Sequence, residues 1–190
     1  MHCLPISNLS MIEEDEAAGE VSDLYTKAKR DLDWPFVPNI LKAMAISPVV
    51  LDMCIDIYHT FFQNTSLPQS LVAMISYCIP AAKNCTYCAA TGELHCRTLG
   101  IDEDMLEMLA KDLGNVSPKR VQAVIEFALK CALDPQALVT EDYERVRHQG
   151  VGNEEIVEII FIAAMANFSD TLADGLKVEV DELVAQALGR

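Results

Sequence analysis

Positive charge is scarce in this sequence of 190 residues, where 14 Lys and Arg stand against 29 Asp and Glu, a formal net charge of −15. Binding to DNA or RNA depends on cations that neutralise phosphates, and the sequence concentrates none. Anionic lipid surfaces are disfavoured for the same reason. We therefore expect neither a nucleic-acid partner nor a membrane partner.

Long hydrophobic runs are also missing. Runs such as Ile159 to Ala166 are far shorter than the roughly 20 residues that a membrane-spanning helix needs. The first ten residues lack the basic start and apolar stretch of a secretory signal. A Gly-rich phosphate loop and a Gly-x-Ser-x-Gly elbow are absent too, so nothing supports a nucleotide-binding or serine-hydrolase site. The sequence predicts a cytoplasmic protein without a membrane segment.

Glycine and proline are limited to 8 residues each, while 51% of the residues are apolar. This composition excludes collagen-like, low-complexity and disordered classes. A chain of this length buries about 70% of its unfolded surface, which is enough for one core without disulfides. We expect a single domain over residues 1–190.

Helical periodicity dominates, because apolar residues recur at i, i+3 and i+4 and no period-two alternation is sustained. Ser10 and Glu13 have the spacing of a capping box that opens a first helix. Ser47-Pro48 and Leu67-Pro68 are typical helix starts, and Pro80 is expected to kink the last turn of the second. Another helix should end at Leu99. The sequence thus predicts an all-α protein, with further helices at about 103–112, 118–132, 141–148, 153–175 and 178–188.

The helix expected from Asn153 to about Gly175 is apolar on most of its circumference. A small monomer cannot cover such a helix on all sides, so it should lie centrally or form an interface. We expect a homo-oligomer.

Cysteine is present in an odd number, which argues against a framework of structural disulfides. The seven cysteines are Cys3, Cys54, Cys78, Cys85, Cys88, Cys96 and Cys131. Most should be buried thiols that behave as small hydrophobic groups. Cys85-Thr86-Tyr87-Cys88 differs, because two cysteines three residues apart at a predicted helix start lie on one face, where free N–H groups stabilise a thiolate. This arrangement favours redox chemistry, in which one sulfur attacks and the second resolves the intermediate.

A zinc site is the competing interpretation, since a lone Cys-x-x-Cys arises by chance or as half of a metal site. Zinc needs two more ligands, and the nearest candidates, His95 and Cys96, lie two to three turns further along the same predicted helix. We expect no bound metal and no other cofactor beyond the cysteine pair itself.

The sequence resembles the AhpD-like proteins related to carboxymuconolactone decarboxylase, specifically their peroxidase-related branch. The resemblance is carried by the order and spacing of Phe36-Val37-Pro38-Asn39, Ser47-Pro48, Leu67-Pro68, Cys85-Thr86-Tyr87-Cys88, Leu99-Gly100, Ala166-Asn167-Phe168 and Leu172-Ala173-Asp174. It implies an all-helical AhpD-like fold, a homo-oligomer, and an alkyl hydroperoxidase-like, peroxiredoxin-type oxidoreductase with an antioxidant role. It also implies that Cys88 attacks a peroxide, that Cys85 condenses with the resulting sulfenic acid, and that a lipoyl-bearing or thioredoxin-like dithiol reduces the disulfide.

Two positions depart from the family pattern. The family places a histidine four residues after the second cysteine and a glutamate twelve residues before the first, where this sequence has Gly92 and Ala73. His95 lies two turns beyond Cys88 on roughly the same face, about 10 Å away by helical rise, so it would need a water or a bend at Gly92. Glu93 is a weaker substitute, about 100° off that face. Tyr87 could hydrogen-bond near the pair, although a buried aromatic contact is its more common use.

Three hypotheses follow. The first is a thiol-dependent peroxidase or disulfide reductase that uses Cys88 and Cys85, with His95, Glu93 and Tyr87 as candidate assisting residues. The second is a catalytically impaired module for redox sensing or interaction, which the missing relay residues favour. Decarboxylation of a lactone acid is the third and weakest, because that branch of the family does not depend on a cysteine pair.

Overall fold

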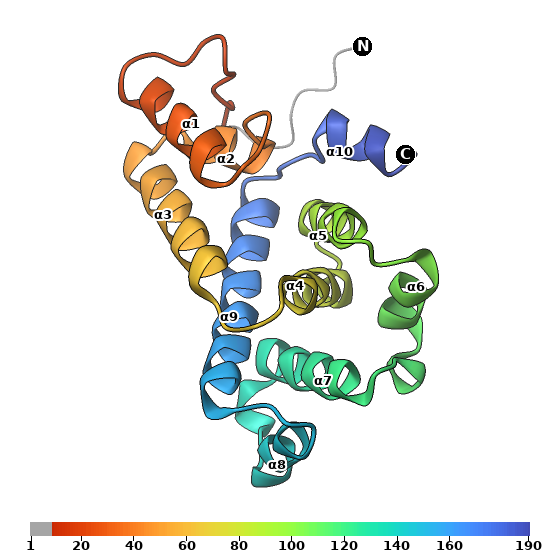
Figure 1. Ribbon diagram of the computed structural model, residues 1–190. Helices are drawn as coiled ribbons and strands as arrows, with labels where there is room; N and C mark the ends of the chain where they lie inside the picture. Colours follow the sequence, from red (N-terminus) through yellow and green to blue (C-terminus); the bar gives the residue numbers. More distant parts are fainter. Residues whose placement is uncertain (1–8) are drawn as a thin grey trace. The chain divides into compact units, whose positions relative to one another are not determined.

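The computed structural model describes residues 9–190, and all regular secondary structure in this range is helical (Figure 1). The all-α prediction is therefore confirmed. The α-helices are α1 (Glu20–Asp31), α2 (Asn39–Met44), α3 (Pro48–Asn64), α4 (Gln69–Lys83), α5 (Thr86–Thr98), α6 (Glu103–Lys111), α7 (Lys119–Leu133), α8 (Thr140–His148), α9 (Asn153–Gly175) and α10 (Glu182–Ala187). Cys3 lies outside the described residues.

The chain divides into two compact units. Unit 1 comprises the described residues up to Thr65 together with Leu172–Asp181, and unit 2 comprises Ser66–Thr171 together with Glu182–Arg190. Helix α9 begins in unit 2 and ends in unit 1. That the chain is one domain over residues 1–190 stays a prediction.

The expected helix start at Ser10 is wrong, because the first helix begins at Glu20, after Gly19 with a φ of 57°. The acidic side chains near the expected helix start form contacts with residues elsewhere in unit 1 instead. Glu13 pairs with Lys42 at 2.8 Å, and Glu14 accepts hydrogen bonds from Lys29 at 2.7 Å and from the backbone N–H of Val37 at 2.7 Å. These contacts hold the segment before α1 as a turn rather than a helix.

Unit 1 forms its core where α1 and α2 pack against α3. The buried side chains of this core include Leu24, Tyr25, Ala28, Val37, Leu41, Leu51, Cys54 and Ile55. The segment after α9 joins the unit through Asp181, whose Oδ1 accepts a hydrogen bond from the Asn39 backbone N–H at 2.8 Å. The short helix α2, which periodicity did not predict, is thereby fixed at its start.

Unit 2 is organised around α4, which packs against α5, α6 and α7. Pro80 does not end α4, because the helix continues to Lys83. A proline cannot donate a hydrogen bond to the carbonyl four residues earlier, here that of Ser76. At this point α5 comes very close, since a Cβ added to Gly92 would lie 2.8 Å from the Ser76 carbonyl oxygen. The two helices therefore pack almost backbone to backbone.

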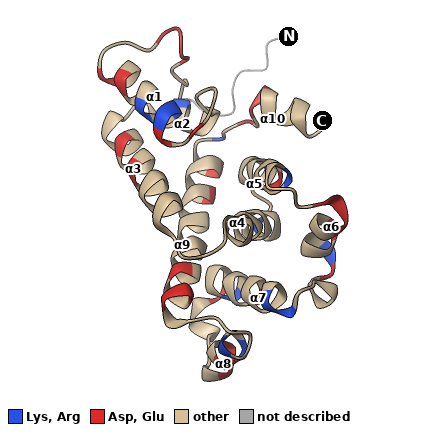
Figure 2. Ribbon diagram, viewed as in Figure 1, with Lys and Arg blue, Asp and Glu red and all other residues tan. Residues whose placement is uncertain are grey.

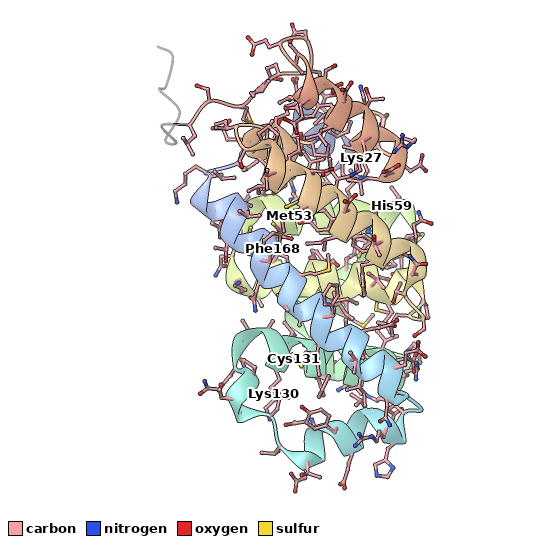
Figure 3. The ribbon with its side chains drawn as sticks, turned by 90° about the vertical axis from the view of Figure 1, so that its left-hand side faces the viewer. Lys27, Met53, His59, Lys130, Cys131 and Phe168 are labelled. Atoms are coloured by element: carbon pink, nitrogen blue, oxygen red, sulfur yellow. The ribbon has the colours of Figure 1, made fainter. Side chains whose placement is uncertain are left out.

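Helix α9 carries two apolar faces. In unit 2 its buried face contains Ile156, Ile159, Ala163 and Ala166. Its other face leaves Val157, Ile160, Phe161 and Phe168 exposed, and Figure 3 labels Phe168 on this helix. By length and composition α9 could cross a membrane, since an 18-residue window within it has a mean hydropathy of 1.6; 44% of that window is buried in the structure.

Charged residues are distributed over both units. In Figure 2, Lys and Arg colour parts of α1, α2, α7 and α8, and Asp and Glu are found on most of the helices. Many of these cations are already paired with acids, as in the contact of Arg120 with Glu155 and that of Lys130 with Asp142.

Candidate functional site

The Cys-x-x-Cys pair lies at the start of α5, where the sequence placed it. Asn84 ends α4 in the left-handed conformation, with a φ of 61°, which asparagine tolerates better than most residues. The Cys85 backbone N–H then donates to the Pro80 carbonyl at 3.0 Å, and the Cys85 carbonyl accepts from Ala89 at 3.0 Å. Cys85 is thus the N-cap residue of α5, and Cys88 lies in its first turn.

The two sulfur atoms are 3.3 Å apart, in contact but not bonded. A disulfide requires about 2.05 Å, so only a small movement would join them. The side chains differ in exposure, because Cys85 is fully buried and Cys88 is half-buried. A small oxidant therefore has better access to Cys88.

A third group joins the pair from a distant part of the sequence. Asp170 lies on the part of α9 that belongs to unit 2, and a carboxylate oxygen and the two sulfurs all lie within 4.8 Å of one another. The Asp170 side chain is only 1% exposed, and neither of its oxygens accepts a hydrogen bond of ordinary geometry, although Nζ of Lys83 pairs with Oδ2. Burial of a carboxylate is costly unless its charge is compensated, so its partners at this site matter.

Lys83 pairs with this carboxylate, and the Asn167 amide in turn binds Lys83. Nζ of Lys83, in the last turn of α4, lies 3.3 Å from Oδ2 of Asp170 and donates to Oδ1 of Asn167 at 2.5 Å. Nδ2 of Asn167 in turn donates to the Ala132 carbonyl of α7 at 2.9 Å. Asn167 and Asp170 are three residues apart on α9, so they share one face of that helix. The end of α4, the end of α7 and the middle of α9 are thereby joined next to the cysteine pair.

The electrostatics of the site act against ionisation of Cys88. A hydrogen bond to Cys85, then burial, then the electrostatic influence of Cys85 and of Asp170 and a side-chain contact with Asp170 raise the pKa of the Cys88 thiol well above its usual range. Free N–H groups at a helix start would lower the pKa of a cysteine, but here these other influences dominate. Cys88 therefore keeps its proton at neutral pH, and activating it requires a base.

The candidate assisting residues lie in other surroundings. Helix α5 runs without a break through Gly92, so His95 stays two turns from Cys88, and burial lowers the pKa of its imidazole. Glu93 is buried and forms ion pairs with Arg97 at 2.8 Å and Arg190 at 2.7 Å. Tyr87 is buried within the first turn of α5. Of the charged groups in the described residues, those that raise the pKa of Cys88 are Cys85 and Asp170.

The two positions that depart from the family pattern have structural explanations. Gly92 faces the Ser76 carbonyl and the Tyr77 Cα of α4, so even a methyl group there would collide with backbone atoms. Ala73 is fully buried in α4. A histidine at residue 92 is incompatible with this close contact of α4 and α5, whereas Asp170 reaches the cysteines from α9 without disturbing it.

Cys85, Cys88 and Asp170 are also the donors in the described chain that come closest to the arrangement of a metal site. Lys83 places a positive charge 3.3 Å from the carboxylate, however, and this ammonium group competes with a cation for the same oxygen.

The remaining described cysteines lie outside the cluster. They are Cys54, Cys78, Cys96 and Cys131, and all are buried. Burial raises the pKa of Cys54 and of Cys131 to about 11 and that of Cys96 to about 12. They are unreactive thiols of the interior, as the sequence predicted for most of the cysteines.

Comparison with solved structures identifies the fold. The chain is similar to a peroxidase-related protein with the alkylhydroperoxidase AhpD core from Ralstonia eutropha JMP134, with 20% identity, a TM-score of 0.83 and 96% of each chain covered. A peroxidase-related protein from Silicibacter sp. TM1040 has 20% identity and a TM-score of 0.82, over 97% of this chain and 96% of that one.

A third similar structure is a cysteine-to-alanine variant of the debrominase Bmp8 in complex with 2,3,4-tribromopyrrole, with 14% identity, a TM-score of 0.80 and 96% of each chain covered. No family model and no curated protein matches the sequence. The AhpD-like fold that the resemblance implied is therefore confirmed from structure. Two of these three neighbours are described as peroxidase-related proteins and the third as a debrominase.

Proposed function

We propose that this protein is a thiol-dependent peroxidase or disulfide reductase with Cys88 as the attacking residue and Cys85 as the resolving one. The observation that carries the proposal is the 3.3 Å contact between the two sulfurs at the start of α5. The pair can pass between dithiol and disulfide with little rearrangement, which is the basic requirement of such an enzyme.

The difference in exposure supports these roles. A hydroperoxide can reach the half-buried Cys88, whereas Cys85 is shielded and need only meet a sulfenic acid that forms next to it. The cycle oxidises the two thiols by two electrons and reduces the hydroperoxide to an alcohol. An external dithiol then reduces the disulfide by exchange.

The reductant, the compartment and the assembly belong to the same proposal. We propose a lipoyl-bearing or thioredoxin-like reductant, a cytoplasmic location where such dithiols are kept reduced, an antioxidant role, and a homo-oligomer. The unbonded, buried cysteines of both units support a reducing compartment.

Two other functions share the same site. The absence of the family's relay residues at Gly92 and Ala73 favours a sensing module that is oxidised without turning over. The similarity to the debrominase Bmp8 favours reductive removal of bromine from an aromatic ring, for which the same pair would supply two electrons.

The test measures thiols and turnover together. The protein is reduced, freed of reductant and treated with one equivalent of an organic hydroperoxide, and free thiols are counted. We expect a loss of two thiols in the parent protein and in Cys131→Ser, a control that removes a buried cysteine outside the pair. We expect no loss in Cys88→Ser.

Turnover separates the three functions. Repeated consumption of hydroperoxide with dihydrolipoamide or a thioredoxin-like protein supports the peroxidase. Oxidation without recycling by either dithiol supports the sensor, and release of bromide from a bromopyrrole without peroxide consumption supports the dehalogenase. A parent protein that keeps all its thiols after peroxide treatment would refute the proposal.

A further inference from the structure

Asp170 is the group at the site that the family pattern does not explain. Its side chain is 1% exposed, the cation paired with it is Lys83, and it lies beside the sulfur that must lose a proton. Burying a carboxylate costs stability even when it is paired, so its position beside two thiols points to a chemical use.

We propose that Asp170 is the catalytic proton acceptor for the Cys88 thiol, and that Lys83 and Asn167 are positioning residues for it. The inference rests on the proposed thiol function. It gives the site an acid-base group on α9 in place of the relay that Ala73 and Gly92 cannot provide.

The proposed step balances as follows. The sulfur of Cys88 attacks the terminal oxygen of the hydroperoxide, so an S–O bond forms and the O–O bond breaks. The thiol proton passes to the Asp170 carboxylate and then to the departing alkoxide, which leaves as an alcohol. The Cys85 thiol next attacks the Cys88 sulfenic acid, an S–S bond forms, and the hydroxide that leaves takes the Cys85 proton, again through Asp170, to give water.

The surroundings of Asp170 suit this role. The titratable groups that lie close to it include Cys85 and Cys88 from the start of α5 and Lys83 from the end of α4, and the Ala132 carbonyl of α7 holds Asn167. Lys83 places a positive charge 3.3 Å from the Asp170 carboxylate, and Asn167 fixes the Lys83 ammonium group. The Asp170 carboxylate oxygen and the Cys88 sulfur lie within 4.8 Å of each other. This distance must shorten for direct proton transfer, as distances between catalytic groups often do when substrate binds.

Asp170→Asn distinguishes this role from a purely structural one, because it should move two rates in opposite directions. Without the acceptor, reaction of Cys88 with a hydroperoxide at neutral pH should slow about 100-fold, within the usual range for general-base catalysis. Without the negative charge, Cys88 should ionise more readily, so its alkylation by iodoacetamide should become faster. Asp174→Asn, an exposed aspartate on the same helix, should change neither rate.

The peroxide rate and the alkylation rate are both measured in a Cys85→Ser background. This background stops the reaction at the Cys88 sulfenic acid and removes the Cys85 sulfur as a possible proton acceptor. Sulfenic acid is trapped with dimedone and alkylation is followed by mass spectrometry of the Cys88 peptide. If Asp170→Asn speeds both reactions, or leaves the peroxide reaction unchanged while that reaction proceeds in the parent, the inference fails and the proposed function stands. If the parent itself does not react with peroxide, the proposed function fails.

Variants of Lys83 test its proposed role in positioning Asp170. Lys83→Gln should slow the peroxide reaction about tenfold and Lys83→Arg should restore most of it, because arginine keeps the charge. Equal rates for both variants and the parent would overturn this role.

A measurement on the parent protein covers the case in which Asp170→Asn does not fold. The rate with peroxide should stay nearly constant between pH 7 and 9 while the alkylation rate rises, because Asp170 and not bulk hydroxide takes the proton. Parallel rises of both rates would refute the relay.

Discussion

Gly92 of α5 lies against the Ser76 carbonyl of α4, so close that a Cβ at residue 92 would be 2.8 Å from that oxygen. The contact brings the first turn of α5, with its cysteine pair, firmly against the end of α4. A histidine at residue 92, the position that the resemblance assigns to one, would not fit between the two helices as they are packed here. In our proposal the acid-base group therefore comes from a helix other than α4 and α5, and it is Asp170 of α9.

Gly92→Ala should destabilise the protein, although alanine is usually favoured over glycine inside a helix by about 1 kcal/mol. The new methyl group would collide with backbone atoms that cannot move aside, and overpacking of this kind costs about 1–3 kcal/mol. The free energy of unfolding from urea titration checks this. Gly175→Ala, at the end of α9 where a Cβ meets nothing within 4 Å, serves as the control and should cost nothing.

Alkylation should discriminate sharply among the cysteines. In native protein at pH 8, we expect iodoacetamide to modify Cys88 before the other described cysteines, because it is half-buried while Cys54, Cys78, Cys96 and Cys131 are enclosed. The raised pKa of Cys88 means that its modification should keep accelerating above pH 9. Peptide mass spectrometry follows each thiol separately. Modification of Cys78 or Cys131 ahead of Cys88 would contradict the structure.

Stability should decline at alkaline pH through the buried thiols, and Cys54 gives the clearest case. Burial raises its pKa from 9.0 to about 11 in the folded protein. A raised pKa contributes stability that is complete below pH 9 and is lost as the pH rises to 11, here about 2–3 kcal/mol. The stability advantage of the parent over Cys54→Ala, measured by urea titration, should therefore shrink between pH 8.5 and 11. A constant difference over that interval would show that the thiol is not buried as described.

The exposed apolar residues of α9 should form an interface between copies of the chain. Val157, Ile160, Phe161 and Phe168 make a stripe at helical spacing on the side of α9 that unit 2 leaves open. Sedimentation of the parent should give a mass above the 21.0 kDa of one chain, and Phe161→Glu should reduce it. Leu99→Glu, which places the same charge on the exposed leucine directly after α5, should leave the mass unchanged. A monomeric parent would refute the predicted oligomer.

Local sequence patterns predicted the helices well and the cysteine pair almost completely. Ser47-Pro48 and Leu67-Pro68 correctly predicted where α3 and α4 begin, and Cys85 lies at a helix start as expected. These signals act within a few residues, so the sequence alone reveals them. The error at Ser10 and Glu13 arose because Glu13 and Glu14 bind lysines on other segments, which no local pattern reveals.

Asp170 left a signal that periodicity could have detected. It occupies the next position of the buried face that runs through Ile159, Ala163 and Ala166, where an apolar residue is expected. An acid on such a face marks a polar site within the core. The residues that Asp170 meets could not be predicted from the pattern, because Lys83 and Cys88 are more than eighty residues away in the sequence.

The amino-acid sequence by itself determined that this chain forms helices, that two cysteines share the first turn of one of them, and that its interior thiols need no disulfides. Only the tertiary structure decided which charged group meets those cysteines. Helix formation depends on neighbours a few residues apart, whereas the meeting of Asp170 with Cys88, and the exclusion of any side chain at residue 92, depend on how α4, α5 and α9 pack together.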